Sequence, residues 1–380
     1  MSSFDVAIVG GGIAGASLAW MLAPKARVLL LEREAQPGYH ATGRSAAMFM
    51  QSYGSPQGRA LTRASAAFYR RPPEGFSDAP LLAPRGVAYV AWEGQQALLA
   101  AAADAIRGAG TLIEPLPAAA ALVRVPVLRA EGLIGALWEP DAMDVDVHAL
   151  HYGFLRGARR HGAELACDAD LVAAERAGST WRLRAADGRR WQATTLVDAA
   201  GAWADVVAGL AGAMPLGLQP RRRSAFTFAP PVGADHRGWP TVAAIDESWY
   251  LKPDAGALLG SPANADPVPP HDVVPEELDI ARGIDAITSH TTLTIRRPIR
   301  TWAGLRSFTP DDEMAIGWDA RVTGFFWLAG QGGWGIQSAA GAALLAATLL
   351  QRDALPEELA VHGVDPAAVA PARFACPERR

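Results

Sequence analysis

Cysteines, clusters of basic residues and uninterrupted apolar runs are all scarce in this sequence of 380 residues. The two cysteines, Cys167 and Cys376, are too few for a disulfide framework or a cysteine-rich metal site, so we expect no metal. The formal net charge is −4 and there is no basic block, which argues against a nucleic-acid partner. These absences predict a soluble enzyme of the cytoplasm.

The longest apolar stretch, from Val6 to Ala23, has the wrong features for a membrane span or a signal peptide. No basic segment precedes it, and four glycines interrupt it. Residues typical of a helix start begin in the middle of the run. We therefore expect no transmembrane segment, although this leaves peripheral contact with a membrane surface open.

The same stretch carries a dinucleotide-binding pattern. Gly10, Gly12 and Gly15 follow an apolar strand and match G-x-G-x-x-G, in which the glycines allow a tight turn, a close approach by a pyrophosphate and close helix–strand packing. The anion would bind at the N-terminus of the following helix. Glu32 lies twenty residues beyond Gly12, after a second apolar strand, where a carboxylate accepts hydrogen bonds from ribose hydroxyls.

This pattern does not by itself decide which dinucleotide binds, because an NAD-dependent Rossmann enzyme also fits it. Arg33 follows Glu32, and a loop of Thr42-Gly-Arg-Ser45 comes soon after. Flavoproteins use such a second loop to hold the flavin-side phosphate and the ribityl chain. The sequence therefore favours FAD.

The rest of the chain divides into nucleotide-binding segments and a β-rich insert. Its length and its hydrophobic content of 50% allow a large core and predict two domains. An apolar strand runs from Trp191 into Gly201, and a strand, a glycine turn and a helix start follow from Phe325 to Gln337. From Leu218 to Ile299 the pattern predicts antiparallel strands. Further segments predict helices over 95–107, 148–161 and 340–351, and strands over 87–92, 163–165 and 171–175.

Taken together, the chain resembles the FAD-dependent D-amino acid oxidase superfamily, and most closely its bacterial D-arginine dehydrogenase branch. The segments that carry the resemblance are 32–40, 42–47, 218–220, 222–226, 250–254, 260–266 and 301–307. The resemblance implies an α/β (α+β) fold of two domains, with a Rossmann-like FAD-binding domain interleaved with an antiparallel β-rich substrate domain. The FAD-binding domain would comprise residues 1–86, 146–217 and 300–380, and the substrate-binding domain residues 87–145 and 218–299.

The resemblance also implies that FAD binds without a covalent bond. His40, where some relatives attach the flavin, is not expected to be a tether. The residues that the resemblance places around FAD are Gly10, Gly12, Ala14, Gly15, Glu32, Arg33, Thr42, Gly43, Arg44, Ser45, Ala47, Leu171, Ala200, Gly201, Trp203, Gly333, Trp334, Gly335, Ile336 and Gln337.

In such enzymes an arginine and tyrosines hold the substrate carboxylate. Arg306, Tyr53 and Tyr250 match those positions, with Arg223 nearby; the Gly333 carbonyl would receive the substrate amine, and Gln337 would border the same space. A guanidinium offers a rigid fork of donors that matches a carboxylate. The alternatives are an ordinary salt-bridge arginine at 306, a solvated arginine at 223 and two merely half-buried tyrosines.

The side-chain pocket departs from the resembled branch. Val87 stands where a glutamate pairs with the substrate guanidinium, Met48 and Met50 replace a histidine and a threonine, and Thr241 and Ala243 are unusually small. Without that carboxylate a buried cationic side chain loses its partner, at a cost of several kcal/mol. The sequence therefore predicts a preference for apolar or aromatic side chains.

We expect FAD-dependent oxidative deamination of D-amino acids. A hydride would pass from Cα to flavin N5, and the imino acid would be hydrolysed to a 2-oxo acid and ammonia. An oxidase of secondary amines, such as proline- or sarcosine-like substrates, a 2-hydroxy acid dehydrogenase and a flavin-binding protein without turnover are the alternatives. The electron acceptor, oxygen or a quinone-type molecule, is left open.

Overall fold

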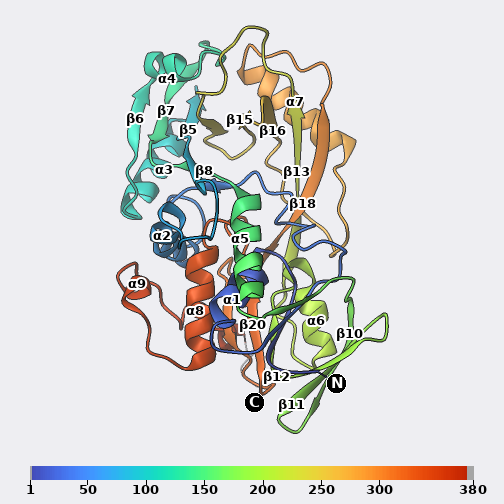
Figure 1. Cartoon of the computed structure of the whole chain (residues 1–380). Coiled ribbons are helices and arrows are strands. Elements are labelled where there is room, and N and C mark those ends of the chain that lie inside the picture. Colours follow the sequence, from blue (N-terminus) through green and yellow to red (C-terminus); the bar gives the residue numbers. More distant parts are fainter. Residues whose placement is uncertain (1, 375–380) are drawn as a thin grey trace, which may run out of the picture.

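Two large β-sheets, each covered by helices, make up the described part of the chain (Figure 1). The structure is a computed structural model that describes residues 2–374, so that Cys376 lies outside it. No helix in this range is long and apolar enough to cross a membrane. The helices are α1 (Ile13–Leu22), α2 (Pro56–Arg70), α3 (Gln96–Gly108), α4 (Ala118–Arg124), α5 (Val147–Arg160), α6 (Ala204–Leu210), α7 (Glu277–His290), α8 (Ala339–Gln351) and α9 (Glu357–Ala360), with 3-10 turns at Gly201–Trp203 and Pro371–Phe374.

The first sheet has eight strands and is parallel at its centre. Its strands are β1 (Ser2–Val9), β2 (Val28–Leu31), β9 (Glu164–Ala166), β10 (Leu171–Ala177), β11 (Thr180–Ala185), β12 (Arg190–Asp198), β19 (Ala315–Trp318) and β20 (Phe325–Ala329). Strands β9, β2, β1, β12 and β20 lie side by side in parallel, whereas β10, β11 and β19 add antiparallel pairs.

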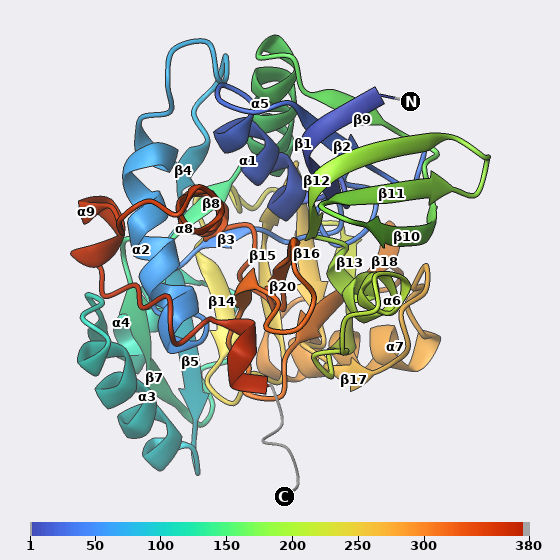
Figure 2. The same ribbon diagram turned by 90° about the horizontal axis from the view of Figure 1, so that it is seen from below.

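Both faces of this sheet are buried at its centre, which explains why the second half of β1, residues 6–9, is apolar without a break. Val6 and Ile8 face a core formed with α1, α5 and α8, while Ala7 and Val9 face a second core formed with α6 and the β10–β11 strands. Figure 2 shows α1, α5 and α8 grouped away from α6. Side-chain caps fix two helix starts, since Ser55 accepts from the N–H of Gly58 and Asp146 from that of Ala149.

The second sheet has nine strands and is antiparallel except where β5 meets β14. Its strands are β5 (Val87–Trp92), β6 (Glu114–Pro117), β7 (Leu133–Glu139), β13 (Gln219–Phe228), β14 (Thr241–Ala244), β15 (Tyr250–Asp254), β16 (Ala257–Ser261), β17 (Asp266–Pro267) and β18 (Arg300–Phe308). A small third sheet consists of β3 (Met48–Phe49), β8 (Met143–Val145) and β4 (Leu82–Pro84).

Alternation along β5 and β14 sends residues to two faces of the second sheet. Ala88, Val90 and Val242 pack in a core that includes residues of α4 and α7. Val87 and Tyr89 point to the opposite face, with Thr241 and Ala243 beside them in register. Helix α3 covers part of that face, and the rest of it borders the cavity described below.

This architecture confirms the predicted fold class of a Rossmann-like sheet combined with an antiparallel β-rich sheet. One expectation was too simple: the segment from Leu218 to Ile299 also contains helix α7, which packs on β13 and β16. The predicted domain division stays a prediction, but strand pairing crosses it at residue 300. Strand β18 begins there and pairs along its whole length with β13 of the second sheet.

Candidate functional site

One cavity of about 970 Å³ joins the two large sheets. At one end it begins where β1 and β12 finish, at Gly10 and Ala199; at the other it reaches Val87 and Ile106. Crevices beyond the carboxyl ends of parallel strands are the usual ligand sites of such sheets. Among residues 2–374 no group of His, Cys, Asp or Glu could hold a metal ion.

The dinucleotide end is formed by the glycine turn and the start of α1. Gly10 has φ +107°, and a Cβ there would clash with the carbonyl of Ala199, so only glycine fits. Gly12, the N-cap residue, provides no side-chain cap for α1. The Thr42 hydroxyl accepts from the N–H of Ile13 at 3.0 Å and ties the second loop to the helix start. The helix end is therefore shaped and polarised for an anion.

Glu32 lines the cavity at this end, as the spacing predicted. Its carboxylate accepts from the N–H groups of Gly11 and Glu34, each at 2.9 Å. Burial raises the pKa of Glu32, and these two N–H groups partly offset the effect. Each oxygen keeps a second lone pair, so the group can still accept from a ribose hydroxyl.

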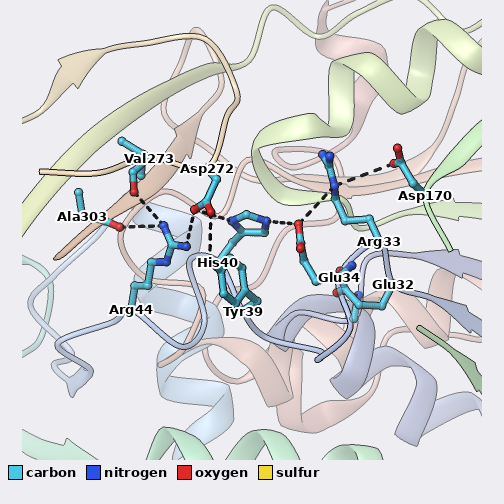
Figure 3. A network of polar contacts seen from close by, with 11 residues as sticks. Glu32, Arg33, Glu34, Tyr39, His40, Arg44, Asp170, Asp272, Val273 and Ala303 are labelled. Carbon is cyan, nitrogen blue, oxygen red and sulfur yellow. Dashed lines mark hydrogen bonds and ion pairs between the residues drawn. The ribbon is translucent and has the colours of Figure 1, made fainter. Parts of the chain in front are cut away.

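A network of polar contacts lies at the same end (Figure 3). The Arg44 guanidinium contacts Asp272 at 2.5 Å and donates to the carbonyls of Val273 and Ala303. His40 Nε2 lies 2.8 Å from Glu34, and its Nδ1 lies 3.9 Å from Asp272. The Arg44 side chain thus joins the predicted FAD loop to a segment before α7.

Three predicted cofactor residues do not line the cavity. Gly15 lies directly under the turn, where a Cβ would clash with the Gly10 carbonyl, in line with the packing role expected of it. Gly43 donates its N–H to the Gly38 carbonyl at 2.7 Å. The buried Trp334 ring packs edge-on against Tyr53 and Phe308. The remaining predicted cofactor residues do line it: Gly10, Gly12, Ala14, Glu32, Arg33, Thr42, Arg44, Ser45, Ala47, Leu171, Ala200, Gly201, Trp203, Gly333, Gly335, Ile336 and Gln337.

Towards the middle of the cavity, Gln331 has an amide nitrogen that is buried and has no hydrogen-bond partner within the described residues. This donor, the open helix start and the cradle at Gly10 fit a long, polar dinucleotide such as FAD. Those residues would hold it by backbone N–H groups and by Glu32.

At the other end, Arg306 and Tyr53 form a pair. Arg306 donates from Nη1 to the Tyr53 hydroxyl at 2.7 Å, and no carboxylate lies within 4.0 Å of its guanidinium among residues 2–374. A Cβ on Gly333 would lie 2.5 Å from Arg306 Nη1 and 2.7 Å from the Tyr53 hydroxyl. Glycine at 333 therefore makes room for the pair.

The other predicted substrate residues share this end of the cavity. Arg223 lines it while donating from Nε to the Asn264 carbonyl at 2.6 Å. Its neighbour Arg222 points away, into a cluster of acids that includes Asp279. Burial raises the pKa of Tyr250 to about 12, so its hydroxyl stays neutral and able to donate. The predicted side-chain wall of Met48, Met50, Val87, Thr241 and Ala243 lines the same end.

Sequence reasoning missed several residues around the site. Glu139, in register with Val87, accepts hydrogen bonds from Ser52 and Tyr89, which line the cavity. The Nε2 atom of His151 lies 2.8 Å from the Gly11 carbonyl, within hydrogen-bond distance, and so supports the glycine turn. Burial lowers the pKa of His151, so the ring is neutral and donates. For Glu139 the sequence did carry one signal, since it is a single acid at the end of the apolar segment 133–139.

Comparisons with known proteins agree with this geometry. Glycine oxidase from Geobacillus kaustophilus superposes with a TM-score of 0.83 at 24% identity, over 98% of this chain and 99% of that one. L-Proline dehydrogenase from P. horikoshii gives 0.83 at 20% identity, over 98% of both chains. Iminodiacetate oxidase from Chelativorans sp. BNC1 gives 0.78 at 23% identity, over 92% of this chain and 97% of that one.

At these identities the superpositions establish the fold. The model of a family described as FAD dependent oxidoreductase matches residues 5–349, which is most of the chain. This match confirms the predicted cofactor, FAD, and the broader family that the sequence resembles. The chain belongs to the FAD-dependent oxidoreductase family.

Proposed function

We propose that this enzyme oxidises D-amino acids with apolar or aromatic side chains to imino acids, which water hydrolyses to 2-oxo acids and ammonia. The observation that carries the proposal is the Arg306–Tyr53 pair, which faces the cavity and, among residues 2–374, has no carboxylate partner. The Arg306 side chain is half-buried and its Nε is buried without a hydrogen-bond partner among the described residues, so a ligand carboxylate is the natural partner. The D-configuration of the substrate is proposed from the sequence motifs that resemble D-amino acid oxidising flavoenzymes.

The reaction needs positioning more than acid–base chemistry. Arg306, Tyr53 and Tyr250 would fix the carboxylate, and the Gly333 carbonyl would accept a hydrogen bond from the amine. When bound, FAD supplies the acceptor for the hydride that leaves Cα and passes two electrons to dioxygen or a quinone-type acceptor. The ammonium first gives a proton to water, so that its lone pair can form the C=N bond as the hydride leaves. No side chain has to act as a general base in this scheme.

The side-chain wall supports the apolar preference. Val87, Met48 and Met50 present no charge, and the carboxylate of Glu139 already accepts from Gln51, Ser52 and Tyr89. Helix α3 adds Ala102 and Ile106 to the cavity lining. A cationic side chain packed against this wall would lose its water, and the occupied carboxylate of Glu139 would not be free to pair with it.

A panel of paired D- and L-amino acids tests the proposal. The FAD-loaded enzyme should reduce an artificial electron acceptor with the D-forms of leucine, methionine and phenylalanine, with kcat/KM values at least tenfold above those for D-arginine and for the L-forms. D-Arginine as the best substrate would contradict the side-chain assignment.

The same panel includes proline, sarcosine and a 2-hydroxy acid. A preference for proline or sarcosine would favour secondary amines, and a preference for the 2-hydroxy acid would replace the amine chemistry. If no compound reduces, and so bleaches, the flavin under anaerobic conditions, the protein binds flavin without turnover. Measurement of peroxide during turnover distinguishes dioxygen from other acceptors.

A further inference from the structure

We infer that Glu139 is a positioning residue that holds Tyr53 against Arg306. It acts through the turn of residues 50–53, which connects β3 to the cap of α2. The inference rests on the proposed function only in that Arg306 and Tyr53 receive a carboxylate.

Gln337 holds this turn from the side of the first sheet. Its side-chain oxygen accepts from the N–H of Met50 at 3.1 Å, and its side-chain nitrogen donates to the carbonyl of Tyr53 at 3.0 Å. The side chain is only 2% exposed. Both ends of its amide are therefore committed to the first and last residues of the turn.

Glu139 holds the turn from the side of the second sheet. Its carboxylate accepts from the N–H groups of Gln51 and Ser52, at 3.2 and 3.4 Å, and from the Ser52 hydroxyl at 2.5 Å. Tyr89 adds a fourth donor at 3.2 Å. Between them, Gln337 and Glu139 bind backbone groups of four consecutive residues, of which Tyr53 is the last.

No cation neutralises this carboxylate. Glu139 is 1% exposed, and no Lys, Arg or His lies within 4.0 Å of it in the part of the chain that the structure describes. Its stability in this place depends on the N–H and O–H donors of the turn and of Tyr89. Burial raises the pKa of Glu139, as expected when only dipoles oppose the loss of hydration.

Removal of the carboxylate would leave the part-buried N–H groups of Gln51 and Ser52 without their acceptor, and the Ser52 hydroxyl with only the Tyr89 hydroxyl, 3.0 Å away. The turn would then have several arrangements open to it, and the Tyr53 hydroxyl would leave its place 2.7 Å from Arg306 for part of the time. Weaker binding of a carboxylate is the expected result, with less effect on the step that follows binding.

The test compares Glu139→Leu with Glu139→Gln, which keeps a carbonyl acceptor for the turn. Glu114→Leu is the matched control, since it removes an exposed acid from the neighbouring strand β6. Binding of benzoate, a carboxylate that needs no turnover, is followed by the change in flavin absorbance of the FAD-loaded enzyme. FAD content and melting temperature are measured on every variant.

We expect Glu139→Leu to raise the benzoate Kd and the amino acid KM at least tenfold, with kcat within threefold of the wild type. Glu139→Gln should recover most of the loss, and Glu114→Leu should bind as the wild type does. If Glu139→Leu retains FAD and binds benzoate within threefold of the wild type, or if Glu139→Gln is as impaired as Glu139→Leu, the inference is overturned.

Should Glu139→Leu fail to fold, Ser52→Ala removes one donor and leaves the carboxylate in place. A benzoate Kd raised threefold or more, with FAD content unchanged, supports the inference, and an unchanged Kd overturns it. The two proposals fail separately. If the wild type oxidises no amino acid but Glu139→Leu still binds benzoate more weakly than the wild type, only the proposed function is wrong. If the wild type oxidises D-amino acids and Glu139→Leu binds benzoate as the wild type does, only the role of Glu139 is wrong.

Discussion

The two ends of the cavity differ in how their charged side chains are paired. At the dinucleotide end, Arg44, Asp272, His40 and Glu34 form a connected set of polar contacts that includes the Arg44–Asp272 ion pair, and Asp272 has a side chain that is 55% exposed. At the substrate end, Arg306 has no carboxylate within 4.0 Å and Glu139 has no cation, within the range 2–374. The guanidinium of Arg44 is thus paired within the protein, whereas that of Arg306 is left for a ligand; Glu32 at the first end, like Glu139 at the second, is held by hydrogen-bond donors.

The two ends should therefore differ in how strongly a substitution affects activity or FAD binding. Exposed ion pairs contribute about 0–1 kcal/mol each and are screened by salt. A buried charge whose partner is removed costs roughly 2–5 kcal/mol. Substitutions at the substrate end should therefore change activity far more than substitutions at the dinucleotide end change FAD binding.

Arg306→Met gives the largest expected effect and tests this contrast most directly. Methionine keeps much of the side-chain volume but leaves the substrate carboxylate without a cation. We expect kcat/KM for the best D-amino acid to fall roughly 10²- to 10³-fold, since about 1.4 kcal/mol corresponds to a factor of ten. FAD content should not change. A loss below fivefold in steady-state kinetics would mean that Arg306 does not hold the carboxylate.

The same contrast explains which parts of the site could be predicted from the sequence. Gly10, Gly12, Glu32 and Thr42 lie within one short segment, and their roles follow from local backbone geometry at a fixed spacing. The contacts of Glu139 depend instead on strand register: it meets Ser52 from 87 positions away. No local pattern encodes such a contact, because pairing between distant strands decides it.

The elements show a similar division. Apolar β1, β5 and β20 were predicted because strands of this kind are buried on one or both faces. Helix α7 was missed within a segment interpreted as strands, although Ile280, Ile284 and Ile287 recur at helical spacing and the helix packs on β13 and β16. The pairing of β18 with β13 was equally invisible to reasoning from local pattern alone.

Val87→Glu would sharpen the comparison by adding a second carboxylate to the substrate end. The new acid would pair with a guanidinium, and we expect kcat/KM for D-arginine to rise roughly tenfold. Its position opposite Glu139 in the antiparallel register limits the gain, because like charges directly opposite are destabilising. Val87→Gln, which adds volume without charge, is the control in the same kinetic assay. Equal gains in both variants would mean that charge at position 87 is not what selects the substrate.

Asp272→Asn tests the dinucleotide end, where a smaller effect is expected. Burial opposes the charged form of Asp272, but hydrogen bonds from Arg44 and Tyr39 outweigh it and lower the pKa of this carboxyl. Loss of the charge should raise the FAD dissociation constant by no more than about fivefold, as for a partly exposed ion pair. The difference from the wild type should shrink in high salt. Asp104→Asn, in an exposed pair with Arg107 on α3, is the control for FAD titration; a hundredfold effect of Asp272→Asn would remove the contrast between the two ends.

Asp198→Asn gives the smallest expected effect and asks whether burial without a cation is costly outside the substrate end. Asp198 ends β12, is 0% exposed and has one oxygen without a partner among the described residues. Burial raises the pKa of Asp198 well above its ordinary 3.8, so the folded state binds more protons than the unfolded state above that pH. Stability contributed by this group therefore falls as pH rises from 3.8 through the folded pKa.

Asparagine keeps an oxygen to accept from the N–H of Ala200 but cannot ionise. We expect Asp198→Asn to melt about 1 °C higher than the wild type at pH 8, at about 2 °C for each kcal/mol, and the gap to close as pH falls towards 4. Asp187→Asn is the control: that carboxyl is exposed, and the backbone N–H of Arg189 lowers its pKa, so its pH dependence runs the other way. The test uses thermal melts of the FAD-saturated enzyme. If the difference in melting temperature between Asp198→Asn and the wild type does not change with pH, the lost charge does not cause that difference. The sensitivity to unpaired charge would then be confined to the substrate end.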